Sequence, residues 1–127
     1  MLLRGAAAGG EALALAGLGL AHAMAQALGG RYGLSHGAMN ALCLPPGLRF
    51  AAAQAPDRVA RFAAAIGHVE VEELARLGGF GRLADFDVPE AELSEIAAAA
   101  AARAGNQNMP RPATADEVEG LLASIYR

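Results

Sequence analysis

The sequence has few of the residues that mark specialised folds. Its 127 residues include one cysteine, no tryptophan and only 5% aromatic residues. Cys43 therefore has no partner for an internal disulfide, and its position between two leucines is typical of a small buried hydrophobic side chain in a reducing compartment. These scarcities exclude a disulfide-stapled scaffold, and they predict a cytoplasmic protein in which Cys43 is structural.

An excess of one charge is also missing. Ten basic and 13 acidic residues give a net charge of −3 at pH 7. The arginines do not cluster in the way that follows a phosphate backbone. Nucleic acid is therefore not an expected partner.

Residues 1–25 raise the alternative of export, because a lone Arg4 precedes an apolar stretch that ends in small residues, as before a signal-peptide cleavage site. Glu11, however, stands where an uninterrupted apolar core should begin, and His22 and Gln26 interrupt the same stretch as a membrane span. We therefore expect no membrane association. The alternative is an exported or membrane-associated helical protein cleaved near residues 23–25, which the mass of the mature chain would reveal.

What the sequence does contain is alanine, leucine and glycine. Hydrophobic residues make up 54% of the chain, and the alanines among them favour helices but bury little area per residue. No segment alternates β-branched and polar residues as a strand would. The length suits one compact domain. The sequence thus predicts an all-α fold, a closely packed helical bundle forming a single domain over residues 1–127.

Glycine, proline and capping signals divide the chain into helices. Gly29-Gly30 is expected to end the second helix, and Pro45-Pro46 the third, because the residue before a proline is disfavoured in helical geometry. Thr114 and Glu117 form a capping-box pattern ahead of the last helix. RYGL is expected to be a loop, and NQNMPRPA a polar connector. The predicted helices span residues 1–16, 18–28, 36–44, 56–66 with EVEELARL continuing the pattern, 89–104, and 118–126.

Two histidines bracket the Gly-Gly pair. His22 is expected toward the end of one helix and His36 in the first turn of the next, behind Ser35 as N-cap, so that the glycine turn brings the two imidazoles together. Imidazole is a preferred ligand for zinc and iron, but a site needs three or four donors. From the residues alone, both a metal site and a pair of ordinary core or surface histidines stay open.

No catalytic residue and no nucleotide-binding residue is predicted. Gly17-Leu-Gly19 begins like a dinucleotide fingerprint, but the third glycine and the preceding strand are absent. Ser35 and His36 are adjacent and point in different directions on a helix, so they do not form a nucleophile and its base.

The segment GLGLAHAMAQALGGRYGLSHGAMNALCLPPGLRF resembles the C-terminal helical domain of the iron-containing alcohol dehydrogenase family, including its maleylacetate reductase branch. VEELARLGGFGRLADFDVPEAEL and MPRPATADEVEGLL resemble the family more loosely, and the resemblance covers nearly all of the chain. The features that carry it are Gly-Leu before His22, Leu28-Gly29-Gly30, Ser35-His36-Gly37 and Asn40-Ala41 followed by Leu44-Pro45.

This resemblance implies that His22 and His36 bind a divalent metal, iron or zinc. Gln26 stands where many members place a histidine near the nicotinamide and substrate, and Pro46 also replaces a common histidine. The family's NAD(P)-binding domain, and the aspartate and further histidine that complete its metal site, do not occur in this chain. The resemblance therefore implies the metal-binding half of a nicotinamide-dependent oxidoreductase, truncated or split, that is inactive and binds metal weakly by itself.

The alternative is a catalytically silent helical module used for interaction or oligomerisation. In either case the missing parts would leave apolar faces uncovered. We expect a homo-oligomer, most simply a dimer through residues 1–20, unless a separately encoded nucleotide-binding half covers that surface.

Overall fold

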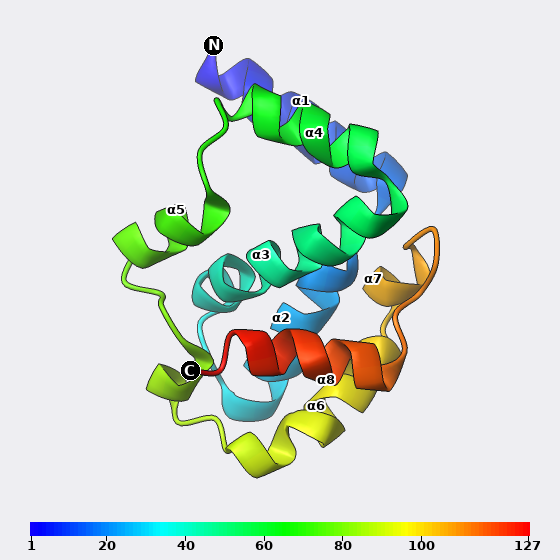
Figure 1. Ribbon diagram of the computed structural model, residues 1–127. Helices are drawn as coiled ribbons and strands as arrows, with labels where there is room; N and C mark the ends of the chain where they lie inside the picture. Colours follow the sequence, from blue (N-terminus) through cyan, green and yellow to red (C-terminus); the bar gives the residue numbers. More distant parts are fainter.

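The computed structural model describes residues 1–127, and every regular element in it is a helix, which confirms the all-α prediction (Figure 1). Two short 3-10 helices, η1 and η2, precede the C-terminal part. The elements are α1 (Leu2–Ala16), α2 (Leu20–Tyr32), α3 (His36–Gln54), α4 (Pro56–Ala65), α5 (Val71–Leu77), η1 (Leu83–Phe86), η2 (Glu90–Glu92), α6 (Leu93–Ala101), α7 (Ala104–Gln107) and α8 (Ala115–Ser124).

Helix α2 is the centre of the packed part of the molecule. It packs most extensively against α3 on one side and α6 on the other, and α8 covers α6 (Figure 1). Burying a large aliphatic side chain stabilises the fold by about 1.5–3 kcal/mol. The largest fully buried hydrophobic side chains are Leu20, Met24 and Leu28 of α2, Met39 of α3, Leu83, Ile96 of α6, and Val118 and Leu122 of α8.

Two glycines mark the closest helix contacts. A Cβ atom added at Gly47 of α3 would lie 2.6 Å from the Cβ of Ala21, and one added at Gly105 would lie 2.6 Å from the carbonyl oxygen of Gly19. Only glycine permits such approaches. The first turn of α2 is therefore held between α3 and α7.

The end of α2 differs from the prediction. The helix continues through Gly29-Gly30 and ends at Gly33, whose φ of 65° is left-handed. Arg31 and Tyr32 therefore lie in its last turn, not in a loop. Tyr32 donates a hydrogen bond of 2.6 Å to Glu92, which also pairs with Arg31 at 2.8 Å. These contacts to the start of α6 favour an extra helical turn that the local glycine signal opposes.

The end of α3 also differs, because the helix runs through Pro45-Pro46 to Gln54. A proline in a helix interior costs about 3 kcal/mol through its lost hydrogen bond and its ring contacts. Here both prolines are buried, and the turn that follows them carries Gly47 against α2. Burial and this contact offset the local cost.

The other helix boundaries differ from the predicted ones by fewer residues. Helix α4 matches the predicted segment 56–66 closely, but α5 is separate from it, since Gly67 and His68 have left-handed φ values of 74° and 57°. Helix α6 begins at Leu93 and ends at Ala101, so it is shorter than the predicted 89–104. The expected polar connector contains α7.

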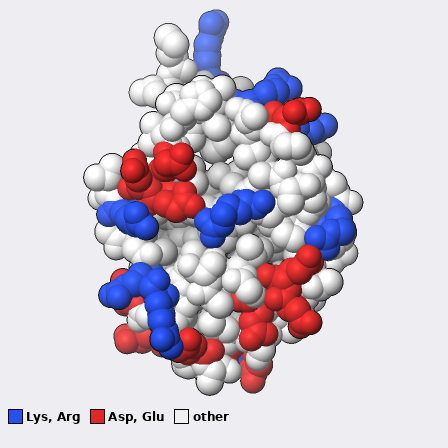
Figure 2. All heavy atoms as spheres, viewed as in Figure 1, with Lys and Arg blue, Asp and Glu red and all other residues white.

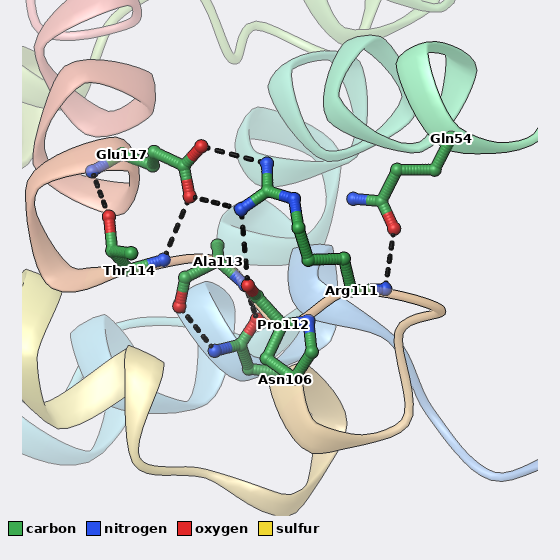
Figure 3. A network of polar contacts seen from close by, with 7 residues as sticks. All are labelled: Gln54, Asn106, Arg111, Pro112, Ala113, Thr114 and Glu117. Carbon is green, nitrogen blue, oxygen red and sulfur yellow. Dashed lines mark hydrogen bonds and ion pairs between the residues drawn. The ribbon is translucent and has the colours of Figure 1, made fainter.

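The segment between α7 and α8 is held by a polar network (Figure 3). The buried Asn106 side chain accepts a hydrogen bond from the Ala113 N–H at 2.8 Å and donates one back to the Ala113 carbonyl at 2.9 Å. Arg111 pairs with Glu117 at 2.8 Å. The predicted capping box of Thr114 and Glu117 is present and begins α8.

Helix α1 differs from the rest, because none of its residues is buried. It meets α2 at a 90° bend, where Gly17 has a φ of 73°. Among the helices, none is individually long and apolar enough to cross a membrane, and only α1 and α2 taken together, across their bend, meet that criterion.

On the face shown in Figure 2, acidic and basic side chains lie interspersed.

Candidate metal centre

His22 and His36 lie against each other. Their ring centroids are 4.8 Å apart, and the rings are inclined at 81°, edge to face. The predicted approach of the two imidazoles is confirmed, although His22 lies in the first turn of α2 and not toward the end of a helix.

The local backbone structure determines where the His22 and His36 rings lie. The Ser35 hydroxyl oxygen accepts a hydrogen bond of 3.4 Å from the Ala38 N–H, so Ser35 is the N-cap of α3, as predicted, and His36 is its first residue. The close contact of Gly47 with Ala21 adjoins His22 in the sequence and fixes the distance between α3 and the first turn of α2.

The surroundings favour a neutral His22. Burial lowers the pKa of the His22 imidazole, and the neighbouring His36 and Arg103 lower it further, whereas an interaction with the Asn40 side chain opposes them. A neutral imidazole keeps a nitrogen lone pair free for a metal. His22 is half-buried and His36 is exposed, so the pair has one partly covered ring and one ring open to solvent.

Gln26 lies one helical turn after His22 on the same face of α2 and is half-buried.

The sequence also predicted that Cys43 is structural and not a reactive thiol. Cys43 is fully buried, and burial raises the pKa of its thiol to about 12, so the group is a neutral packing element at pH 7.

Two residues of this region were not predicted as site residues. Asn40 follows His36 by one turn of α3, and its side chain opposes the lowering of the His22 pKa. Arg103 lies between α6 and α7, near His22 and with its Nη2 atom 3.9 Å from the position of a Cβ on Gly30. The one sequence signal for Arg103 is a lone charge in the alanine-rich run AAAAAARAG.

A metal site needs more donors than the two imidazoles. Zinc in proteins takes four ligands in structural sites and three protein ligands in catalytic ones. In residues 1–127 no three His, Cys, Asp or Glu side chains are grouped so that they could hold a metal ion. His22 and His36 are therefore two candidate donors without a third beside them.

Comparison with known proteins identifies the class. The sequence model of the Fe-containing alcohol dehydrogenase family, C-terminal, matches residues 1–126. The chain therefore belongs to this family and corresponds to its C-terminal domain.

A particular relative is the 1-propanol dehydrogenase PduQ of Salmonella typhimurium (strain LT2). It is 33% identical over 142 aligned residues, which include 91% of this chain. The same alignment includes 37% of the relative, so the chain spans little more than a third of that protein's length.

Proposed function

We propose that this chain is the metal-binding helical half of a nicotinamide-dependent alcohol dehydrogenase or maleylacetate reductase-like oxidoreductase. The observation that carries the proposal is the 4.8 Å approach of His22 and His36 in a chain that matches the family's C-terminal domain. A divalent iron or zinc ion bound there supplies Lewis-acid polarisation of an alcohol or carbonyl oxygen. The setting we propose is the cytoplasm.

Each of the three candidate residues would have a different role. His22, kept neutral by burial, would be the inner ligand, and His36 the outer one. Gln26 would face the substrate and the nicotinamide from the next turn of α2. Its amide can donate and accept hydrogen bonds but does not exchange protons near neutral pH, so we assign it positioning and no proton transfer.

NAD(P) would be held by a separate domain. No strand–turn–helix that could cradle its phosphates occurs in this all-helical chain. We therefore expect no dehydrogenase activity from the chain alone. A micromolar dissociation constant for NAD(P), measured by calorimetry on this chain, would contradict that division between two domains.

The metal assignment is tested by titrating Zn²⁺ alone into the chain in a calorimeter. Two imidazoles bind a divalent ion weakly, so we expect weak binding that dialysis against a chelator removes. His22→Ala and His36→Ala should each abolish it. His68→Ala is the matched control, because the third histidine is exposed and lies in the turn before α5.

Two outcomes would contradict this account. If one equivalent of metal survives chelator dialysis, other donors complete the site. If His22→Ala binds Zn²⁺ as well as the wild type does, the second candidate function is favoured, a catalytically silent interaction module. The lack of a third donor beside the histidine pair is the observation that supports this second candidate.

We also propose that a second copy of the chain covers α1. Leu2, Leu3 and Leu15 are 91%, 87% and 83% exposed, and Leu13 is 48% exposed. Exposed apolar side chains that gather on one element often mark an interface, and symmetric self-association is the commonest way to bury such a surface.

Light scattering tests this proposal. We expect a dimer that Leu13→Glu dissociates, with Arg61→Glu on the exposed surface of α4 as the control. A mass of one 12.8 kDa subunit across the micromolar range would refute self-association. It would favour the alternative cover, a separately encoded nucleotide-binding half.

A further inference from the structure

The large apolar side chains that are exposed fall into two groups. One group belongs to α1 and the preceding Met1, the surface for which a second copy is proposed above. The other lies on the side of α4 and α5, and its members are Leu44, Phe62, Val69, Leu74 and Leu77. A contact through α1 leaves this second group uncovered.

Helix α5 lies at one edge of the molecule (Figure 1). Among the helices it packs extensively only against α3. Ala75 is buried on its inner side, whereas Glu73 and Leu77, one turn apart, are exposed on its outer side. Leu77 is 85% exposed. The outer face of α5 is therefore open to another molecule.

An apolar hollow of about 210 Å³ adjoins this face. Leu44 lines it from α3, Val71 and Leu74 line it from α5, and Phe80 lines it from the segment that follows α5. A cavity of about 150 Å³ accommodates a benzene molecule, so this hollow has room for a leucine side chain. Each copy of the chain thus presents a projecting leucine, Leu77, next to an apolar hollow.

The charges of α5 favour a second copy as the partner. Glu70, Glu72 and Glu73 lie at its start, and Arg76 lies in its last turn. Glu72 pairs with Arg49, but Glu73 and Arg76 are exposed and form no ion pair within the chain. When two α5 helices lie antiparallel, the acidic start of each faces the basic end of the other.

We propose that α5 is a self-association surface. Two copies would pair their α5 helices antiparallel across a two-fold axis near Leu74, and Leu77 of each copy would enter the hollow of the other. About this axis Leu77 of one copy is level with Val71 of the other, and Arg76 comes within one residue of Glu73. The contact is isologous, so each pairing occurs twice. It depends neither on the metal centre nor on the α1 contact.

The patch is small compared with a standard interface, which contains about 20–30 residues from each partner. We therefore expect a weak association, with a dissociation constant between about 0.1 and 1 mM. This range lies above the micromolar concentrations at which the α1 contact is tested.

A concentration series of the ¹⁵N-labelled Leu13→Glu variant tests the contact, because this variant lacks the proposed α1 interface. From about 0.05 to 2 mM, the mass from sedimentation should rise from one subunit toward two. The amide signals of Leu44, Val71 and Leu74 should shift with the same midpoint. Adding Leu77→Glu should raise the dissociation constant about tenfold or more. Ala99→Glu, at an exposed position of α6, is the matched control and should leave it unchanged.

A charge exchange tests the antiparallel arrangement. Glu73→Arg and Arg76→Glu should each weaken the association about two- to fivefold, because each places like charges opposite one another. The double variant restores opposite charges across the axis and should recover the original dissociation constant. A role of either residue in the monomer alone would not produce this recovery.

Four results would overturn the proposal: a mass of one subunit at every concentration, an unchanged dissociation constant after Leu77→Glu, signal shifts confined to residues outside α3 and α5, or no recovery in the double charge variant. A mass of one subunit throughout would leave the α5 surface to a different chain. None of these results bears on α1, which is judged by comparing Leu13→Glu with the wild type at micromolar concentrations, or on the Zn²⁺ titration.

Discussion

Helices α1 and α2 are adjacent in the sequence and both are rich in alanine, but only α2 is packed into the core. Both are rich in alanine, leucine and glycine, although α2 also carries His22, Met24 and Tyr32; α1 has no buried residue, whereas α2 has six. Helix α2 lies between α3 and α6, and α1 turns away from them at the 90° bend (Figure 1). Composition makes both segments helical, but the neighbours available to each decide which one is core.

The largest expected effect compares one large apolar side chain from each helix. Met24 of α2 is fully buried, so Met24→Ala should lower the free energy of unfolding by about 2–5 kcal/mol. Leu13→Ala in α1 should change it by less than about 0.5 kcal/mol at concentrations where the chain is monomeric. Urea denaturation measures both. Equal losses would mean that α1 is packed in the monomer, and the contrast between the helices would fail.

A smaller effect compares two glycines. Gly47→Ala would force a Cβ to within 2.6 Å of the Ala21 Cβ, and we expect it to cost about 1–3 kcal/mol. Gly9→Ala in α1 meets nothing within 4 Å and should stabilise the helix by about 0.5–1 kcal/mol. Thermal melts of the two variants should therefore move in opposite directions. Stabilisation by both would show that α3 and α2 can separate without cost.

The smallest expected effect concerns the N-terminal ends of α1 and α8 and the pH dependence of stability. Helix α1 has no capping side chain, whereas α8 begins with a capping box. The ion pair with Arg111, and then the hydrogen bond from the Thr114 N–H, lower the pKa of Glu117 from 4.5 to about 2. Because the folded-state pKa is lowered, this stabilisation is complete above pH 4.5 and is lost as the pH falls toward 2.

Glu117→Gln keeps an acceptor for the Thr114 N–H but has no charge. Its melting temperature should therefore depend less on pH than that of the wild type over this window, and Arg111→Gln should behave similarly. A wild-type pH profile in both variants would mean that the Arg111–Glu117 pair contributes nothing to stability.

Much of the candidate centre could be read from the sequence. His22 and His36 were predicted from the family pattern around them, and their approach is confirmed. The metal itself, and the role of Gln26, stay predictions. Asn40 and Arg103 could not be assigned in advance, because each affects the pKa of His22 from another part of the chain, α3 and the α6–α7 junction, and no local pattern specifies that proximity.

The sequence by itself determined the elements whose signals act within about one helical turn. The capping hydrogen bond of Ser35, the capping box of Thr114 and Glu117 and the start of α4 at Pro56 all join residues close along the chain. Only the tertiary structure decided where α2 and α3 end. The bonds from Arg31 and Tyr32 to Glu92 span about 60 residues, and buried prolines continue α3 against Ala21. Contacts so distant in the chain outweigh the local glycine and proline signals because they exist only after the helices have packed.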